Sequence, residues 1–302
     1  MKKDDSSLDY QKLDNVKKHA KKLLEEADAI GQLPTPVEHI VSTAKLYVNK
    51  EISLGKDENF ISKLGKKMGK VARPHLHGFK KLLGMLYVPS GEIYLDHSQH
   101  ENKKKFIKLH ETGHGFLPHQ KKMYEFMEDG KLELDPEIED TFEREANNFA
   151  VELLFQLDKF EKMAADYEIS IKTPLDLSGK FGSSIYAGMR RYVQTHFAPL
   201  ALAVYDLPKG NKFHLRRMPM YSESFLKRFG RVGLPNPCDD FNPLGSIIKA
   251  AKLRTNHLCG LRDLNGDIHE TAVHIFSNSY EKFIMLIPVR RALNKKQEFY
   301  VN

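Results

Sequence analysis

A five-residue motif, His110-Glu111-Thr112-Gly113-His114, constrains this chain more than any other feature of its sequence. Residues i and i+4 of an α-helix lie one turn apart on the same face, so both imidazoles can reach one metal ion. Glu111 would project nearby, where it can take a proton from a water molecule rather than bind the metal. The motif therefore predicts a zinc site, with His110 and His114 as ligands and Glu111 as the catalytic base.

Such a zinc site needs a third protein ligand. One class of zinc peptidases uses a third histidine, with glycine three and histidine six positions beyond the second ligand. Those positions are Leu117 and Gln120 here, which excludes that class. His119 follows Pro118, and we expect it to be an ordinary loop or surface histidine.

A second class of zinc peptidases takes a glutamate from a later helix, and residues 139–154 have the required pattern. Their apolar side chains form one helical stripe, made of Phe142, Ala146, Phe149, Ala150 and Leu153. Glu143 and Glu145 lie near opposite borders of this stripe, so periodicity does not choose between them. The small Ala146 would let two helices approach closely, as a shared metal requires.

Together these segments resemble the ImmA/IrrE family of zinc metallo-endopeptidases. The family pattern of a Phe, then HExGH, then ExEAxxFAxxLL is matched by Phe106, residues 110–114 and residues 143–154. The opening at residues 33–40 and the strand at residues 91–95 also resemble the family, so the likeness covers roughly residues 30–155. By this resemblance the glutamate directly before alanine, Glu145, is the third ligand. Glu143 is then a candidate to contact the ligands without binding the metal itself.

The resemblance also implies a function. Members of the family cleave a helix-turn-helix repressor, usually encoded beside them, and so switch on a stress, mobile-element or defence response. The chain is then expected to be an endopeptidase with Zn²⁺ as cofactor and a repressor as substrate. The alternative is a DNA-binding transcriptional regulator with a structural zinc site, using residues 177–193 and the basic flanks. A structural site has no need of Glu111, which favours the peptidase.

The expected fold class is α+β, in three parts. Residues 1–170 would form a mainly helical, zincin-like peptidase domain with a short β-sheet, residues 171–199 a helix-turn-helix-like linker, and residues 200–302 a GAF-like α+β sensor domain. The strand at Ile93–Asp96 is expected to offer an edge to which a substrate adds as a strand. Periodicity predicts helices over residues 13–24, 37–47, 101–116, 136–156, 222–229 and 244–253, a loop over 63–81, and strands over 85–88, 92–95, 200–205, 257–261, 270–277 and 283–289.

Charge is unevenly distributed along the chain. Six basic and sixteen acidic residues give residues 110–170 a net charge of −10, whereas residues 61–109 carry +8 and residues 171–302 carry +10. Basic segments are the usual footprint of a polyanion. We therefore expect single-stranded DNA or a nucleotide to activate the enzyme through residues 200–302. The alternative is that this part only forms a homodimer or docks the repressor.

Composition limits the remaining possibilities. Cys238 and Cys259 are the two cysteines, too few for a disulfide scaffold or a four-cysteine zinc site, and we expect buried or free thiols. No apolar run approaches the roughly 18 residues of a membrane span. The first residues are polar and lack the apolar stretch of a secretory signal. These features predict a soluble, cytoplasmic protein without a membrane partner.

Overall fold

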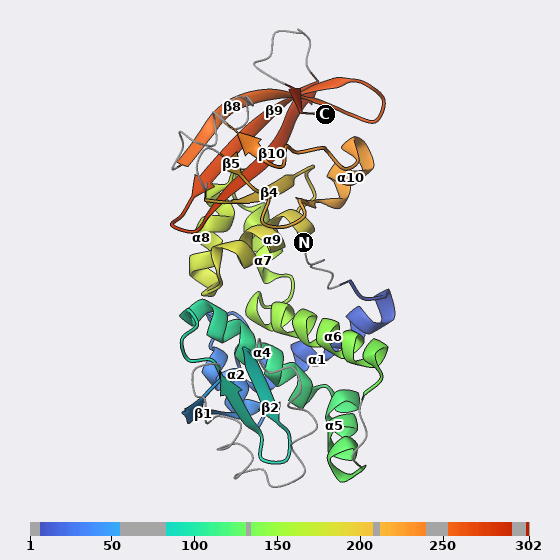
Figure 1. Cartoon of the computed structure of the whole chain (residues 1–302), viewed down its shortest axis with the longest axis vertical. Coiled ribbons are helices and arrows are strands. Elements are labelled where there is room, and N and C mark those ends of the chain that lie inside the picture. Colours follow the sequence, from blue (N-terminus) through green and yellow to red (C-terminus); the bar gives the residue numbers. More distant parts are fainter. Residues whose placement is uncertain are drawn as a thin grey trace. The chain divides into compact units, whose positions relative to one another are not determined.

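The computed structural model describes residues 7–54, 83–130, 134–207, 212–239, 253–291 and 300–301. The chain divides into two compact units. We call Asp5–Lys159 with Gly179–Ser184 the N-terminal unit, and Phe160–Ser178 with Ile185–Asn302 the C-terminal unit. Both combine helices with a β-sheet (Figure 1), which confirms the α+β class.

The N-terminal unit is mainly helical. Its helices are α1 (Tyr10–Glu26), α2 (Val37–Thr43), α4 (Glu101–Phe116), α5 (Pro118–Gly130) and α6 (Pro136–Leu154). Side-chain caps fix two of the starts, because Asp9 and Asp135 accept the backbone N–H groups of Lys12 and Glu137. The long helices predicted from apolar periodicity are confirmed, whereas α2 ends at Thr43, four residues earlier than expected.

A three-stranded sheet lies beside these helices. Its strands are β1 (Tyr47–Ser53), β2 (Gly84–Tyr87) and β3 (Glu92–Leu95), in the order β1-β3-β2. The expected hairpin is confirmed, with Leu86 opposite Ile93 in the antiparallel pair. The expectation that β3 offers a free edge is wrong, because β1 pairs with it in parallel on its other side. Within the described residues, β2 lies at an edge of this sheet.

Helices α4 and α6 pack closely against each other. A Cβ atom added to Gly113 of α4 would lie 3.1 Å from the Cα atom and 3.3 Å from the Cβ atom of Ala146 of α6. Phe149, one turn further along α6, is fully buried. Small residues at the crossing therefore bring the motif of α4 close to the glutamates of α6.

The C-terminal unit is built on a six-stranded sheet with the order β11-β8-β9-β10-β4-β6. The strands are β4 (Ala201–Asp206), β6 (Met220–Tyr221), β8 (Leu253–Arg262), β9 (Ile268–Ser277), β10 (Glu281–Arg291) and β11 (Tyr300–Val301). A separate pair consists of β5 (Lys212–Phe213) and β7 (Cys238–Asp239). Figure 1 shows β8, β9 and β10 as long neighbouring strands, so the strands expected in this region are confirmed.

Helices accompany this sheet, namely α7 (Lys159–Ala165), α8 (Lys172–Phe181), α9 (Ile185–Thr195) and α10 (Glu223–Phe229). Helix α9 packs on β4 and β6, and its residues Met189, Tyr192 and Val193 are buried. A second buried cluster includes Phe225 and both Cys238 and Cys259, which are free thiols as expected.

The unit boundary differs from the expected domain limits. It falls between Lys159 and Phe160 rather than at residue 170, and the proposed linker, residues 171–199, divides between the units. Helices α8 and α9 are the two helices expected there, and α9 packs against the sheet of the C-terminal unit. The loop expected over residues 63–81 lies outside the described residues. So do residues 244–252 of the helix expected over residues 244–253. Within the described part of the chain, no helix combines the length and apolar character needed to cross a membrane.

Candidate metal centre

Helix α4 presents His110 and His114 on one face, one helical turn apart. Their Nε2 atoms lie 3.1 Å from each other. The opposite ring nitrogens contact amide oxygens, with His110 Nδ1 3.1 Å from Asn147 Oδ1 and His114 Nδ1 2.8 Å from Gln120 Oε1. Each imidazole is therefore held by an amide from another helix while its Nε2 atom faces a common point.

Glu143 of α6 completes this group. Its two carboxylate oxygens lie 3.4 Å from the Nε2 atoms of His110 and His114. Burial alone would raise the pKa of Glu143, but hydrogen bonds with the two histidines outweigh it and hold the pKa well below its ordinary value. Glu143 thus stays ionised next to the two imidazoles.

The three residues suit a zinc ion. Zinc–nitrogen and zinc–oxygen bonds of about 2.0–2.2 Å at tetrahedral angles separate ligand atoms by about 3.3–3.6 Å. The contacts among His110, His114 and Glu143 measure 3.1, 3.4 and 3.4 Å. All three ligand atoms lie within 4.8 Å of one another. Two imidazole nitrogens and one carboxylate are also a donor set that zinc prefers.

The structure does not bring Glu145 to the histidine pair, contrary to the expectation that it is the third ligand. The Glu145 carboxylate is buried and contacts helix α5 instead, with Oε2 2.6 Å from His119 Nε2 and 2.7 Å from Gln120 Nε2. Residues two positions apart on a helix lie about 200° apart around its axis, so Glu143 and Glu145 leave α6 on different sides. The carboxylate expected only to support the ligands, Glu143, is the one beside them.

Glu111 lies beside this centre and is buried. Burial raises the pKa of its carboxyl group above the ordinary value, although the nearby histidines oppose the shift. A backbone hydrogen bond from Leu86 of β2 also reaches the carboxylate. Gly84 of β2 is so close that a Cβ atom there would lie 2.6 Å from Glu111 Oε1. Strand β2 therefore holds Glu111 at the centre, as expected of a residue acting on a bound substrate.

Several residues at the centre were not expected from the sequence. Gln120 served only to exclude a histidine, and Asn147 and Tyr124 were not considered. The Tyr124 ring packs edge-on against His114, with centroids 5.7 Å apart. His119, expected to be an ordinary histidine, binds Glu145 and packs edge-on against Phe142. A signal was available only for Asn147, which lies on α6 one turn from Glu143.

Comparison with known proteins agrees with this site. Residues 61–187 match the family model described as the IrrE N-terminal-like domain, a peptidase family. No curated protein matches the chain significantly. Among solved structures the chain is similar to a Mycobacterium tuberculosis transcriptional regulator, with a TM-score of 0.52 and 11% identity over 91% of this chain and 76% of that chain. That likeness is one of fold alone, whereas the family match supports the ImmA/IrrE family for the part of the chain that carries the candidate metal centre.

Proposed function

We propose that this protein is a zinc-dependent endopeptidase whose metal ligands are His110, His114 and Glu143. The observation that carries the proposal is the convergence of these three donors at 3.1–3.4 Å, with the buried Glu111 beside them. A structural metal site would not need a buried carboxylate next to its ligands. The peptidase family match over residues 61–187 supports the same chemistry.

The side chains divide the work between binding and proton transfer. When bound, zinc supplies Lewis acidity toward the scissile carbonyl group and the attacking water. Glu111 accepts a proton from that water and returns it to the leaving nitrogen. Its raised pKa suits it to both steps, because a carboxylate with a pKa nearer neutrality holds the proton more readily. The backbone of Leu86 keeps the Glu111 carboxylate oriented.

Strand β2 provides a place for the substrate. It is an edge strand within the described residues, and Leu86 on it reaches Glu111. An extended peptide that adds to β2 as a further strand would therefore pass beside the metal ligands. We propose that the peptide belongs to a helix-turn-helix repressor, whose cleavage switches on a stress, DNA-damage or phage-defence response.

The decisive experiment replaces Glu111. A small helix-turn-helix protein found in the neighbouring reading frame would be the repressor candidate for this experiment. Glu111→Gln should fold and bind zinc but cleave this protein about 10²–10⁴-fold more slowly. Glu137→Gln, which changes an exposed glutamate on α6, should cleave at the wild-type rate. Near-normal cleavage by Glu111→Gln would contradict the proposal, and operator binding without any cleavage would favour the DNA-binding regulator instead.

We further propose that the C-terminal unit is a GAF-like sensor domain that restrains the peptidase until an activator binds. The activator would be single-stranded DNA or a nucleotide, and the same unit could mediate a homodimer. Some of its basic side chains are already paired, since Arg216 lies 2.7 Å from Glu281 and Lys227 lies 2.5 Å from Glu223. An anionic activator would therefore rely on other residues, among them Arg231.

Activation is tested by measuring repressor cleavage with and without single-stranded DNA across a salt series. Phosphate contacts would make activation fall steeply as salt rises, because bound counterions are released when the complex forms. Equal cleavage with and without nucleic acid at every salt concentration would exclude single-stranded DNA as the activator.

A further inference from the structure

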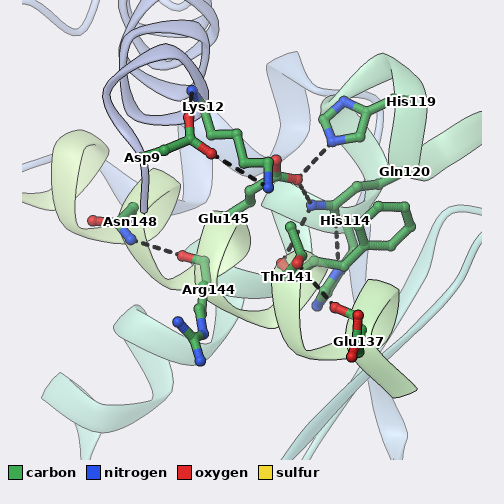
Figure 2. A network of polar contacts seen from close by, with 11 residues as sticks. Asp9, Lys12, His114, His119, Gln120, Glu137, Thr141, Arg144, Glu145 and Asn148 are labelled. Atoms are coloured by element: carbon green, nitrogen blue, oxygen red, sulfur yellow. Dashed lines mark hydrogen bonds and ion pairs between the residues drawn. The ribbon is translucent and has the colours of Figure 1, made fainter. Parts of the chain in front are cut away.

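Glu145 occupies an unusual position for a charged residue. It is only 4% exposed, yet it does not contact the histidine pair of the metal centre. Its Oε2 atom accepts hydrogen bonds from His119 and from Gln120, both on helix α5 (Figure 2). A buried carboxylate is costly unless hydrogen bonds compensate it, so this contact fixes the local arrangement of α5 and α6.

Gln120 connects Glu145 to the metal centre. The side chain is fully buried, and its Nε2 atom has two neighbours that can only accept a hydrogen bond. These are Glu145 Oε2 at 2.7 Å and the carbonyl oxygen of Phe142 at 3.2 Å. An amide nitrogen is a donor and the amide oxygen an acceptor, so the NH₂ group of Gln120 must face α6. Its oxygen is thereby directed at His114.

The direction of this amide determines the tautomer of His114. Gln120 Oε1 lies 2.8 Å from His114 Nδ1, and because Oε1 can only accept, Nδ1 must carry the proton. A neutral imidazole with its proton on Nδ1 has a lone pair on Nε2. His114 Nε2 faces His110 Nε2 and the Glu143 carboxylate, to which the other tautomer would donate its proton and beside which a metal ion would bind. A flipped amide would set its oxygen against the Glu145 carboxylate and the Phe142 carbonyl, which repels it.

We propose that Glu145, acting through Gln120, holds His114 in the Nδ1-protonated tautomer and so positions its Nε2 atom for metal binding. Glu145 and Gln120 are then positioning residues, not ligands. The inference rests on the proposed metal centre for its purpose, but the contacts that decide the tautomer are present in the metal-free protein: Gln120 Oε1, 2.8 Å from Nδ1, competes with Glu143, 3.4 Å from Nε2, for the proton of a neutral His114. His110 has a separate partner, Asn147, so its tautomer does not depend on Glu145.

The test compares four variants of the full chain with the wild type. Gln120→Met keeps the side-chain length but removes both hydrogen-bonding groups. Glu145→Leu removes the carboxylate, and Glu145→Gln retains an oxygen that can still accept from Gln120. Thr141→Val is the matched control, because it removes a side-chain hydrogen bond to Glu137 on α6 without touching Gln120.

Two quantities are measured for each variant. Zinc affinity is obtained by competition with a chromogenic chelator, and the tautomers of His114 and His110 in zinc-free protein by long-range ¹H–¹⁵N correlation spectra. Circular dichroism and cooperative unfolding confirm that each variant is folded.

Gln120→Met and Glu145→Leu should bind zinc about 10–100-fold more weakly, as is usual when the partner of a metal-binding histidine is lost. In both, a neutral His114 should shift toward the Nε2–H tautomer, which donates to Glu143, while the His110 signals stay unchanged. Glu145→Gln should lose less affinity than Glu145→Leu, and Thr141→Val should match the wild type. If the buried Gln120→Met variant does not fold, the two Glu145 variants still decide the question.

Some results would overturn the inference. One is wild-type zinc affinity, within about threefold, in Gln120→Met and Glu145→Leu; another is an unchanged His114 tautomer in both. A wild-type protein that binds no zinc would instead overturn the proposed function, while the tautomer spectra would still decide whether Glu145 and Gln120 control His114.

Discussion

Gly113 and Ala146 face each other where helices α4 and α6 cross, and a Cβ atom on Gly113 would lie 3.1 Å from the Cα atom of Ala146. The Cα atom of Ala146 belongs to the backbone of α6, which cannot rotate away from an added Cβ atom as a side chain can. The absence of a side chain at Gly113 therefore sets the spacing between the helix that carries the histidines and the helix that carries Glu143.

Gly113→Val should destabilise the protein and weaken zinc binding together. Forcing extra atoms into a packed contact costs about 1–3 kcal/mol, and the helices must separate to admit them. Gly113→Ala should be milder, because alanine favours a helix by about 1 kcal/mol over glycine. Thermal unfolding and zinc content report both effects. Unchanged zinc affinity in a folded Gly113→Val protein would show that the helix spacing does not control the centre.

Replacing the ligand glutamate should be more damaging to zinc binding than replacing its neighbours. Glu143→Ala removes one of three protein ligands and should weaken zinc binding more than the roughly 10–100-fold loss expected for partners of the ligands. Glu139→Ala, one turn earlier on α6 and exposed, should bind zinc normally. Metal analysis of both purified proteins checks this. If Glu143→Ala retained its zinc, the third ligand would have to be Glu145 instead.

Gly84→Ala should impair catalysis more than zinc binding. The new Cβ atom would lie 2.2 Å from Ile107 Cγ2 and 2.6 Å from Glu111 Oε1, so either strand β2 or the Ile107 and Glu111 side chains must shift. The metal ligands on α4 and α6 are not displaced directly. We expect turnover of the repressor to fall at least about tenfold, a fraction of the full effect of a catalytic base. Gly179→Ala is the control, since its Cβ atom meets nothing within 4 Å.

Acid should weaken the C-terminal unit through Asp263. Burial raises the pKa of this carboxyl group, but hydrogen bonds from His269 at 2.8 Å and from the backbone of Asp267 and Asn265 outweigh it, so the net pKa is lowered. The unfolded chain therefore binds the proton first, and the stabilisation is lost as pH falls below the ordinary Asp pKa of about 3.9.

Asp263→Asn should cost about 1.5–3 kcal/mol at pH 7, the value of a hydrogen bond to a charged group. The difference from the wild type should shrink as pH falls through this range. Urea unfolding at several pH values measures it, with Asp14→Asn as the control, because Asp14 forms an exposed ion pair that contributes little. A difference independent of pH would exclude the charge of Asp263 as its source.

Both cysteines should resist modification in the folded protein. Cys238 and Cys259 are fully buried, and burial raises the pKa of the Cys259 thiol to about 12. The thiolate is the reactive form, so neither should react quickly with a thiol reagent at pH 8. Titration before and after denaturation should show two thiols appearing only on unfolding. A fast-reacting thiol in the native protein would contradict the burial of both cysteines.

The parts of the fold that the sequence predicts are those determined by local pattern. Helix α1 follows from its apolar face, which includes Val16 and Leu23, and the β2–β3 hairpin follows from two apolar runs around a turn. Strand β1 is not predicted by such a pattern, because Asn49, Lys50 and Glu51 interrupt its apolar residues. It becomes a strand through pairing with β3, a contact far along the chain.

The choice between Glu143 and Glu145 depends on a similar distant contact. Both glutamates flank the same apolar stripe, so the sequence of α6 does not show which of them faces the histidines. What separates them is the position of α5, whose Gln120 and His119 hold Glu145. The resemblance to a family pointed to Glu145 as the ligand, whereas the structure places Glu143 beside the histidines, because the partner of each carboxylate lies outside the motif.

Strand β4 pairs with β10, which lies about 80 positions later in the chain. The ribosome therefore synthesises β10 long after β4. During synthesis the residues up to 184, which include His110, His114 and Glu143, leave the ribosome before residue 281 exists. The N-terminal unit can therefore complete its ligand set while β4, buried along most of its length in the finished protein, still has an open edge. A chain that stops between residues 207 and 280 would keep every candidate ligand, yet we expect it to aggregate through β4.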